Sequence, residues 1–233
     1  MSYTFTVKLS EVRAVLLAAA MKDIRYYLNG VLFDFTHEGL NLVATDGHRM
    51  HALRASKVEY GDEKPAIGTQ LIVHESVLRA IKVAVTKTAD ALTILVTPNE
   101  SRPSSHPPKV VVKTQTGQSW ETEAVDGVFP DYWRVLPCRD YSVTNPAAQI
   151  APDYLRDAGF ALAHLLGAKR NSSWLSMTVL SAPPAPNGTS TGVAVVSESY
   201  PNFIAVIQGY KTHRSASIPT WVSRKTEKTE EFA

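Results

Sequence analysis

The sequence predicts an α+β protein built from a repeated unit of one strand, one helix and three further strands. Two observations support this class. Short stretches of strand length with alternating or continuous apolar residues dominate the chain, and helical periodicity begins near residues 9, 75 and 152. These starts lie roughly 65–75 residues apart, a spacing that indicates a repeated supersecondary unit. In each unit we expect the helix to lie on one face of an antiparallel sheet.

The first unit shows the pattern clearly. Aromatic and polar residues alternate over Tyr3–Lys8, as in a half-buried strand, and apolar residues recur at helical spacing over Leu9–Met21. Ser10 is placed to cap this helix, and the alanines near its end have high helix propensity. An Asp-Gly pair at residues 46 and 47 predicts a tight turn, because Gly47 adopts a positive φ at no steric cost. The expected strands are Leu28–Phe35, Leu40–Ala44 and Met50–Ala55.

The same order of elements recurs twice. In the second unit a helix is expected over Glu75–Val85, and in the third over Asp153–Leu166, where Pro152 suits the first helical position and Gly167 the end. From Lys211 onward the chain becomes polar, and we expect its last residues to be disordered. The expected strands of these two units are Thr69–Val73, Ala91–Val96, Val110–Lys113, Ser119–Ala124, Ala147–Ile150, Trp174–Leu180, Gly192–Ser197 and Phe203–Gln208.

Composition places the chain among ordinary globular proteins. Its 233 residues are 44% hydrophobic and 20% charged, and no apolar run reaches the roughly 18–20 residues that span a bilayer. The start of the chain has no signal-peptide pattern and Cys138 is the single cysteine, so we expect a cytoplasmic protein without disulfides. A net charge of +2 permits contact with nucleic acid without requiring it.

Catalytic motifs are absent from the sequence. There is no GxSxG, HExxH or P-loop pattern. Asp46 and His48 are two residues apart and have no third ligand at a metal-binding spacing. We therefore expect a protein that is not an enzyme, with no catalytic residues, no metal and no cofactor.

Two long motifs carry a family resemblance. The first joins RYYLNGVLF, residues 25–33, to ATDGHR, residues 44–49, and the second is DGVFPDYWRVLP, residues 126–137. In this order and spacing they closely resemble the middle domain of the bacterial DNA polymerase III sliding clamp, the β subunit. The resemblance implies the DNA-clamp fold of repeated β-α-βββ units. It divides the chain into a complete clamp-like domain at residues 1–137, a half-domain at residues 138–212 and a tail at residues 213–233.

The resemblance also implies contact with double-stranded DNA. Aromatic side chains in the loop after the first helix would stack or wedge against DNA without sequence preference, and basic side chains would contact phosphates. For any exposed lysine or arginine the simpler interpretation is a solvated surface, and for either tyrosine it is packing in the core. The residues expected to contact DNA are Arg13, Lys22, Arg25, Tyr26, Tyr27, Arg79 and Lys82.

A second implied site is a pocket for short peptides of DNA polymerases, clamp loaders and repair proteins. Apolar side chains would anchor such a peptide, while histidine and arginine side chains would orient its backbone or an acidic group. The simpler interpretation of the ATDGHR motif is a structural turn with Asp46 as the cap. The residues that match the pocket are Leu28, Thr45, Gly47, His48, Arg49, Met50, Pro130, Arg134 and Val135.

The sequence therefore predicts a shortened sliding-clamp-like processivity factor that encircles DNA and tethers replication or repair proteins. Clamp rings contain twelve such units, so three units per chain predict a homo-oligomer, with a tetramer favoured and a trimer possible if the tail holds a fourth unit. One alternative is a clamp-like interaction protein that forms no ring and competes for clamp-binding partners. Another is a simple non-specific DNA-binding protein.

Overall fold

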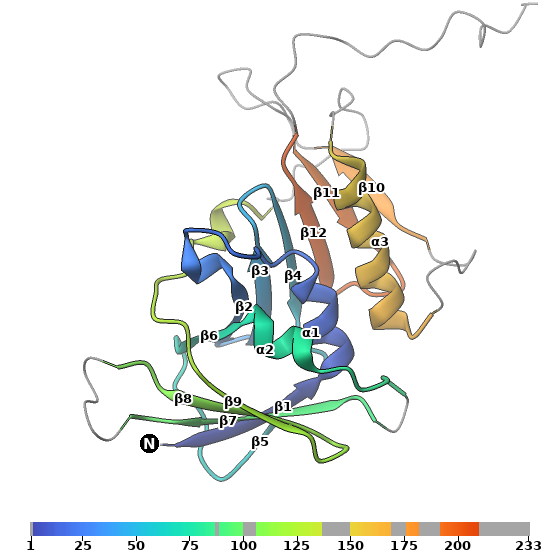
Figure 1. Ribbon diagram of the computed structural model, residues 1–233. Helices are drawn as coiled ribbons and strands as arrows, with labels where there is room; N and C mark the ends of the chain where they lie inside the picture. Colours follow the sequence, from blue (N-terminus) through green and yellow to red (C-terminus); the bar gives the residue numbers. More distant parts are fainter. Residues whose placement is uncertain are drawn as a thin grey trace, which may run out of the picture.

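Two antiparallel sheets and three α-helices form the part of the chain that the computed structural model describes, namely residues 2–86, 89–99, 106–136, 150–168, 176–181 and 192–209. The helices are α1 (Leu9–Leu16), α2 (Glu75–Ala80) and α3 (Pro152–Leu166), and they lie together beside the second sheet (Figure 1). The predicted α+β class with repeated β-α-βββ units is confirmed.

The first sheet has five strands and the second has seven. The first runs in the order β5 (Glu59–Tyr60), β1 (Tyr3–Lys8), β7 (Ala91–Thr97), β8 (Lys109–Thr114) and β9 (Ser119–Glu123). The second runs in the order β10 (Thr178–Ser181), β11 (Val193–Val196), β12 (Phe203–Ile207), β4 (Arg49–Arg54), β3 (Gly39–Thr45), β2 (Gly30–Thr36) and β6 (Gln70–His74). The two-residue strand β5 was not predicted from the sequence.

The first two units exchange their leading strands. Strand β1 leaves its own unit to pair with β7, from Tyr3 opposite Val96 to Lys8 opposite Ala91. Strand β6, the first strand of the second unit, pairs in turn with β2 of the first unit, from Gly30 opposite His74 to Asp34 opposite Gln70. Each sheet therefore contains strands of both units, and neither unit is complete without the other.

The third unit joins the first along one sheet edge. Strand β12 pairs antiparallel with β4, from Phe203 opposite Leu53 to Ile207 opposite Arg49, and α3 packs against α1. A partly buried contact lies beside this seam, where the Tyr200 hydroxyl donates a hydrogen bond to Glu11 Oε1 at 2.6 Å. The second sheet therefore extends without interruption from the first unit into the third.

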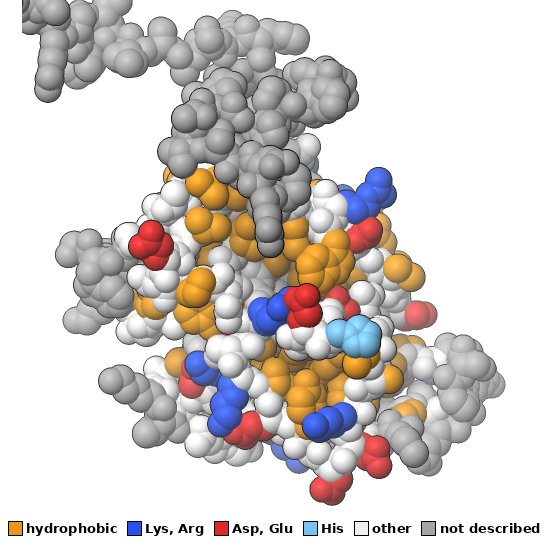
Figure 2. Space-filling model, turned by 180° about the vertical axis from the view of Figure 1, so that it is seen from behind, with side chains coloured by type: hydrophobic (Ala, Val, Ile, Leu, Met, Phe, Trp, Pro, Cys, Tyr) orange, Lys and Arg blue, Asp and Glu red, His pale blue; other side chains and the backbone are white. Residues whose placement is uncertain are grey.

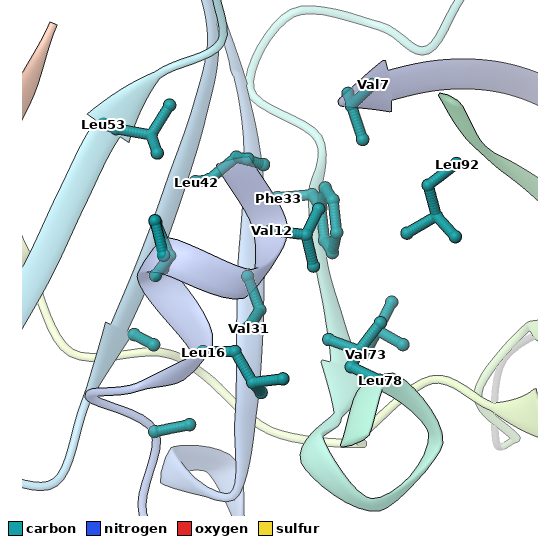
Figure 3. Close-up of a cluster of buried hydrophobic side chains, with 14 of the residues drawn as sticks. Val7, Val12, Leu16, Val31, Phe33, Leu42, Leu53, Val73, Leu78 and Leu92 are labelled. Atoms are coloured by element: carbon teal, nitrogen blue, oxygen red, sulfur yellow. The ribbon is translucent and has the colours of Figure 1, made fainter. Parts of the chain in front are cut away.

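Helix α1 lies at the centre of the main hydrophobic core. All of its residues are buried except Arg13, which is half-buried, because α2, α3 and the strands of the second sheet pack around it. Figure 3 shows Val12 and Leu16 of α1 close to side chains from both sheets. The other labelled residues of this cluster are Val7, Val31, Phe33, Leu42, Leu53, Val73, Leu78 and Leu92.

Two helices are shorter than the sequence predicted. Helix α1 ends at Leu16 rather than Met21, and the three alanines that follow are buried in tight turns, where Ala20 N–H donates to the Leu28 carbonyl. Ser10 does not cap the helix, since its N–H and hydroxyl both donate to the Asp90 carboxylate. Helix α2 ends at Ala80 rather than Val85. Tertiary packing here overrides helix propensity.

The third helix agrees with its prediction. Pro152 occupies the first turn of α3, and Gly167 ends the helix with φ of 61° in the left-handed region. Strand β10 begins at Thr178, later than the predicted start at residue 174, and residues 174 and 175 lie outside the described ranges. Also outside these ranges are Cys138, the predicted strand at residues 147–150 apart from its last residue, and the predicted tail at residues 213–233.

Candidate DNA-binding loop and partner surface

The loop from α1 to β2, residues 21–28, is held in one conformation by its own side chains. Asn29 Oδ1 accepts a hydrogen bond from Asp23 N–H, and Asn29 Nδ2 donates to the Asp23 carbonyl. Arg25 donates through Nε and Nη2 to the two oxygens of Asp23, at 3.0 and 2.7 Å. This bidentate pair lowers the pKa of Asp23 to about 2. Lys22 is exposed and adopts φ of 58°.

Tyr26 and Tyr27 differ in their surroundings. The Tyr26 side chain is 56% exposed at the start of a short 3₁₀-helix, Tyr26–Leu28. Tyr27 is half-buried and lies against Gly127: a Cβ added to this glycine would be 2.9 Å from the Tyr27 Cβ. The two rings meet edge to face, with centroids 5.8 Å apart. Tyr27 therefore supports the loop from below, while Tyr26 presents its ring to solvent.

The β3–β4 turn, residues 45–49, has the predicted tight geometry. Asp46 Oδ1 accepts hydrogen bonds from the N–H groups of His48 and Arg49, at 2.9 and 3.0 Å, and Gly47 has φ of 90°. Arg25 Nη2 donates to the Asp46 carbonyl at 3.1 Å, so the turn touches loop 21–28. A Cβ on Gly47 would lie 2.8 Å from this guanidinium. Glycine is therefore favoured here by φ, whereas the guanidinium is the end of a flexible side chain that can move aside.

Arg49 lies in this turn but points into the seam between the first and third units. Its guanidinium forms ion pairs with Asp46 and Asp157, and it lies over the Tyr154 ring with 4.6 Å to the centroid. The side chain is only 13% exposed. The structure thus assigns Arg49 to the internal connection between β4 and α3, leaving little of it available to a peptide.

Segment 125–136 crosses the outer face of the second sheet. Phe129 and Tyr132 pack there against Met50 in a second, smaller hydrophobic cluster. The Tyr132 hydroxyl donates to Asp34 Oδ2 at 2.6 Å and accepts from Asn41 Nδ2 at 3.0 Å. These contacts fix the backbone of the segment, so that its exposed side chains Pro130, Arg134 and Val135 project outward.

The third unit lies next to the β3–β4 turn at residues 45–49. Val206 of β12 lies opposite Met50, and Gln208 N–H donates to the His48 carbonyl at 2.8 Å. The predicted pocket residues are thus divided by exposure: Gly47, His48, Pro130, Arg134 and Val135 are exposed, Thr45 and Arg49 are half-buried, and Leu28 and Met50 are buried beneath. We refer to the exposed residues of turn 45–49 and segment 130–135 as the partner surface.

A cavity of about 260 Å³ lies near the partner surface, farther along the seam. None of the predicted pocket residues lines it. Its apolar walls come from β4, β12 and segment 125–136, with Trp133 stacked on Tyr132 at a centroid distance of 5.0 Å. The lining residues are Asn41, Ala52, Leu53, Arg54, Tyr132, Trp133, Leu136, Pro201, Asn202 and Ile204. Sequence reasoning missed this cavity because β12 lies about 150 residues from β4 in the chain.

The two arginines predicted on helix faces act within the fold. Arg13 Nη2 donates to the carbonyls of Ile81 and Val83, at 3.1 and 2.6 Å, and burial lowers its pKa. Arg79 pairs with Glu75 and donates to the Leu16 carbonyl. The helix predicted over Glu75–Val85 would have carried both Arg79 and Lys82 on one face, three residues apart, but α2 ends at Ala80 and Lys82 lies beyond it. Lys82 itself is exposed.

Acidic and basic side chains alternate over the face of the molecule seen in Figure 2. Lysine and arginine side chains are scattered singly among aspartate and glutamate on this face, with hydrophobic side chains gathered between them. Mixed charge of this kind suits solubility and produces no strong field of one sign.

Buried ionisable groups at the seam are structural. His51 is fully buried, its Nδ1 lies 2.8 Å from the Ala14 carbonyl oxygen, and burial lowers its pKa to about 4.

Among the described residues no group of three or more His, Cys, Asp and Glu side chains is arranged to hold a metal ion. None of the helices within the described ranges is long and apolar enough to cross a membrane.

The repeated β-α-βββ units and their antiparallel sheets define a protein with a clamp-type fold. The structure resembles the crystal structure of the DnaN sliding clamp (DNA polymerase III subunit beta) from Bartonella birtlesii bound to griselimycin, with a TM-score of 0.52 and 15% identity. The match covers 90% of this chain and 66% of that chain. At this identity the likeness shows a shared fold.

Sequence comparison gives the family. Residues 6–131, more than half of the chain, match the family model of the DNA polymerase III beta subunit, central domain. The chain is 32% identical over 161 residues to the beta sliding clamp of Vibrio cholerae, covering 65% of this chain and 36% of the relative. It is 31% identical over 126 residues to that of Escherichia coli K12, covering 54% and 30%. The chain therefore belongs to the DNA polymerase III beta subunit family, and it spans about a third of the length of these curated relatives.

Proposed function

We propose that this protein is a sliding-clamp-like processivity factor that holds DNA at loop 21–28 and tethers replication proteins at the partner surface. The observation that carries the proposal is the direct contact of these two sites, through the hydrogen bond from Arg25 to the Asp46 carbonyl. The work is mechanical, since linkage to DNA keeps a weakly bound partner at high effective concentration near its template.

Contact with DNA is assigned to the exposed groups of the loop. Tyr26 offers an aromatic face that stacks on bases of any sequence, a contact worth roughly 1–3 kcal/mol per base. Lys22 and Arg25 lie on either side of Asp23 and are exposed to phosphates. Lys82 is a further exposed cation, whereas Tyr27 packs against Tyr26, and Arg13 and Arg79 make internal contacts outside this loop. Binding through so few charges would be weak and sensitive to salt.

Contact with partner proteins is assigned to the exposed residues of turn 45–49 and segment 130–135. Val135 and Pro130 supply apolar contact area, while His48 and Arg134 supply polar groups for a peptide backbone or an acidic side chain. Strand β12 closes this surface on the side of the turn, so a bound peptide would touch the first and third units together. We also propose the domain division at residues 1–137 and 138–212, and a homo-oligomeric ring, with four chains favoured over three.

Retention on closed DNA tests the clamp proposal. The protein is incubated with a nicked circular plasmid and with the same plasmid made linear, and protein remaining on DNA is measured by gel filtration at increasing salt. A clamp is retained on the circle and slides from linear ends. Tyr26→Ala and Lys22→Gln should reduce retention, whereas Lys57→Ala, which removes an exposed lysine from another part of the surface, should leave it unchanged. Equal retention on both DNAs would refute encirclement and support simple non-specific binding.

A second candidate is a clamp-like interaction protein that occupies clamp-binding partners without encircling DNA. It is favoured by the internal use of Arg13 and Arg79, which leaves α1 and α2 with little free positive charge among their described residues. Binding of a short clamp-binding peptide from a DNA polymerase, measured by fluorescence anisotropy with Val135→Asp as the disrupting variant, tests the partner surface alone. Peptide binding without DNA retention would establish this second function.

A further inference from the structure

Strand β9 ends the first sheet with an open edge. Among the described strands it pairs with β8 only, and its residues Ser119–Glu123 form the outermost row. The Thr114 N–H donates to the Gln118 carbonyl and the Ala124 N–H donates to the Pro108 carbonyl, both at 2.9 Å. Because hydrogen-bonded and non-hydrogen-bonded pairs alternate along an antiparallel ladder, the even-numbered residues of β9 bond to β8. The N–H and C=O groups of residues 119, 121 and 123 therefore point to the open edge.

The seam between the first and third units shows how this fold completes such an edge. Strands β4 and β12 are the last strands of their units, and they pair antiparallel while α1 and α3 pack side by side. Strand β9 is the last strand of the second unit, and α2 contacts it as α1 contacts β4. In a second copy of the chain β4 and β12 are already paired with each other, so of the three strands that end a unit only β9 has no such partner among the described residues. The other strands at sheet ends, β5, β6 and β10, do not end a unit.

We propose that β9 is a self-association edge, at which two copies of this chain pair their β9 strands antiparallel about a two-fold axis. The contact is isologous, since each copy offers the same residues to the other. It differs from the head-to-tail closure expected of a ring of identical clamp subunits. The proposal goes beyond the proposed function and does not depend on DNA or on peptide partners.

Charge and strand overlap together favour one register for this pairing, since an axis at Ser119 opposes no carboxylates but brings Glu121 opposite Gly117 of the β8–β9 turn. Side chains on one face of a sheet meet across the strands, so the two-fold axis must relate residues of the same parity. An axis at Glu121 would place this carboxylate opposite its own copy, and an axis at Thr122 would place it opposite Glu123 of the second copy. An axis at Trp120 instead places Glu121 opposite Ser119, and no two carboxylates are directly opposed.

The Trp120 register also has favourable packing. It makes Trp120 and its copy a non-hydrogen-bonded pair, in which the side chains approach most closely, while residues 119 and 121 exchange hydrogen bonds. Trp120 is half-buried and packs against the main core, so the pairing extends an existing hydrophobic cluster. Lys113 lies beside Ser119 on β8, one strand away from the incoming Glu121. Opposite charges therefore lie in the same row of the sheet, separated by Ser119.

The proposed interface between two β9 strands is small, and its affinity should be low. Five strand residues and a six-residue helix bury much less surface than the interfaces of stable complexes. We expect dimers at high protein concentration that dissociate on dilution. Glu121 and Glu123 would also serve to guard an edge strand against pairing, and the measurement below decides between these two roles.

Sedimentation equilibrium of the 233-residue chain without DNA tests the proposal. Association through this edge alone should raise the average mass from 25.5 kDa toward twice that value as concentration increases, whereas closure of the proposed ring would carry it to three or four times that value. Ser119→Lys places a cation opposite Glu121 at two symmetric positions and should tighten the dimer about fivefold, whereas Ser119→Glu should weaken it by a similar factor. Ser199→Lys and Ser199→Glu introduce the same charges in an exposed turn of the third unit and should leave the dimer unchanged.

A backbone variant provides the decisive control. Glu121→Pro removes an N–H that points to the open edge, so the β8–β9 ladder is kept and circular dichroism should match that of the original chain. The same variant should abolish the dimer. A chain that remains monomeric at every concentration overturns the proposal, and so does a dimer that persists in Glu121→Pro or responds equally to the Ser119 and Ser199 changes. DNA retention can fail while this dimer forms, so failure of the proposed function is separately visible.

Discussion

The hydroxyl of Tyr132 is the strongest single test of how segment 125–136 is held on the sheet. In Tyr132→Phe the ring remains, but Asp34 loses the donor at 2.6 Å and Asn41 loses its acceptor at 3.0 Å. All three residues are buried, and the Asp34 side chain keeps a longer contact from Gln70 Nε2, at 3.3 Å. A hydrogen bond to a charged group contributes about 1.5–3 kcal/mol, so we expect the free energy of unfolding to fall by about 2 kcal/mol.

Urea denaturation followed by circular dichroism measures this loss directly. For a chain of this size the same change lowers Tm by about 4–8 °C. Tyr26→Phe is the matched control, because it removes a hydroxyl from an exposed ring and should change stability by less than about 0.5 kcal/mol. If Tyr132→Phe unfolds at the same urea concentration as Tyr26→Phe, the buried hydrogen-bond network does not hold the segment. Burial and the bond to Asp34 both raise the pKa of Tyr132, so the hydroxyl stays protonated at neutral pH.

Three further predictions concern the seam and the backbone. His51 has a pKa of about 4 in the folded protein against an ordinary 6.5, so between these pH values the unfolded chain binds a proton that the folded chain does not. The folding equilibrium constant should therefore be unaffected by this group above pH 6.5 and fall by up to about tenfold per pH unit as the pH drops toward 4. In urea titrations His51→Asn should show a shallower decline of stability over this range. Arg49→Ala removes the ion pairs to Asp46 and Asp157 and leaves Asp157 a longer pair to Arg156, at 3.5 Å, so it should cost about 2–4 kcal/mol and raise protease cleavage in the third unit. Lys57→Ala, at the exposed pair with Glu59, should cost less than about 1 kcal/mol. Gly30→Ala places a Cβ 2.6 Å from a β6 carbonyl oxygen and should lower the yield of folded protein, measured by gel filtration, more than the same change at the unobstructed Gly159.

Some features of this protein were determined by local sequence. The alternation over Tyr3–Lys8 predicted β1 correctly, and Pro152 and Gly167 marked the two ends of α3. The Asp46-Gly47 pair predicted the tight turn, because the side chain of one residue and the φ of the other act within a few bonds. The RYYLNGVLF, ATDGHR and DGVFPDYWRVLP motifs indicated the family that residues 6–131 confirm.

Other features were decided only by tertiary structure. The alanines after Leu16 favour a helix, yet they pack in turns because α1 is enclosed by the sheet and by two other helices. Arg49 and Arg13 read from the sequence as exposed cations, but Asp157 and the Ile81 and Val83 carbonyls, 68 to 108 residues away, engage them. The exchange of β1 and β6, and the pairing of β12 with β4, likewise join distant segments. Periodicity reports which face of an element is apolar, whereas the partner of that face is selected by packing across the whole chain.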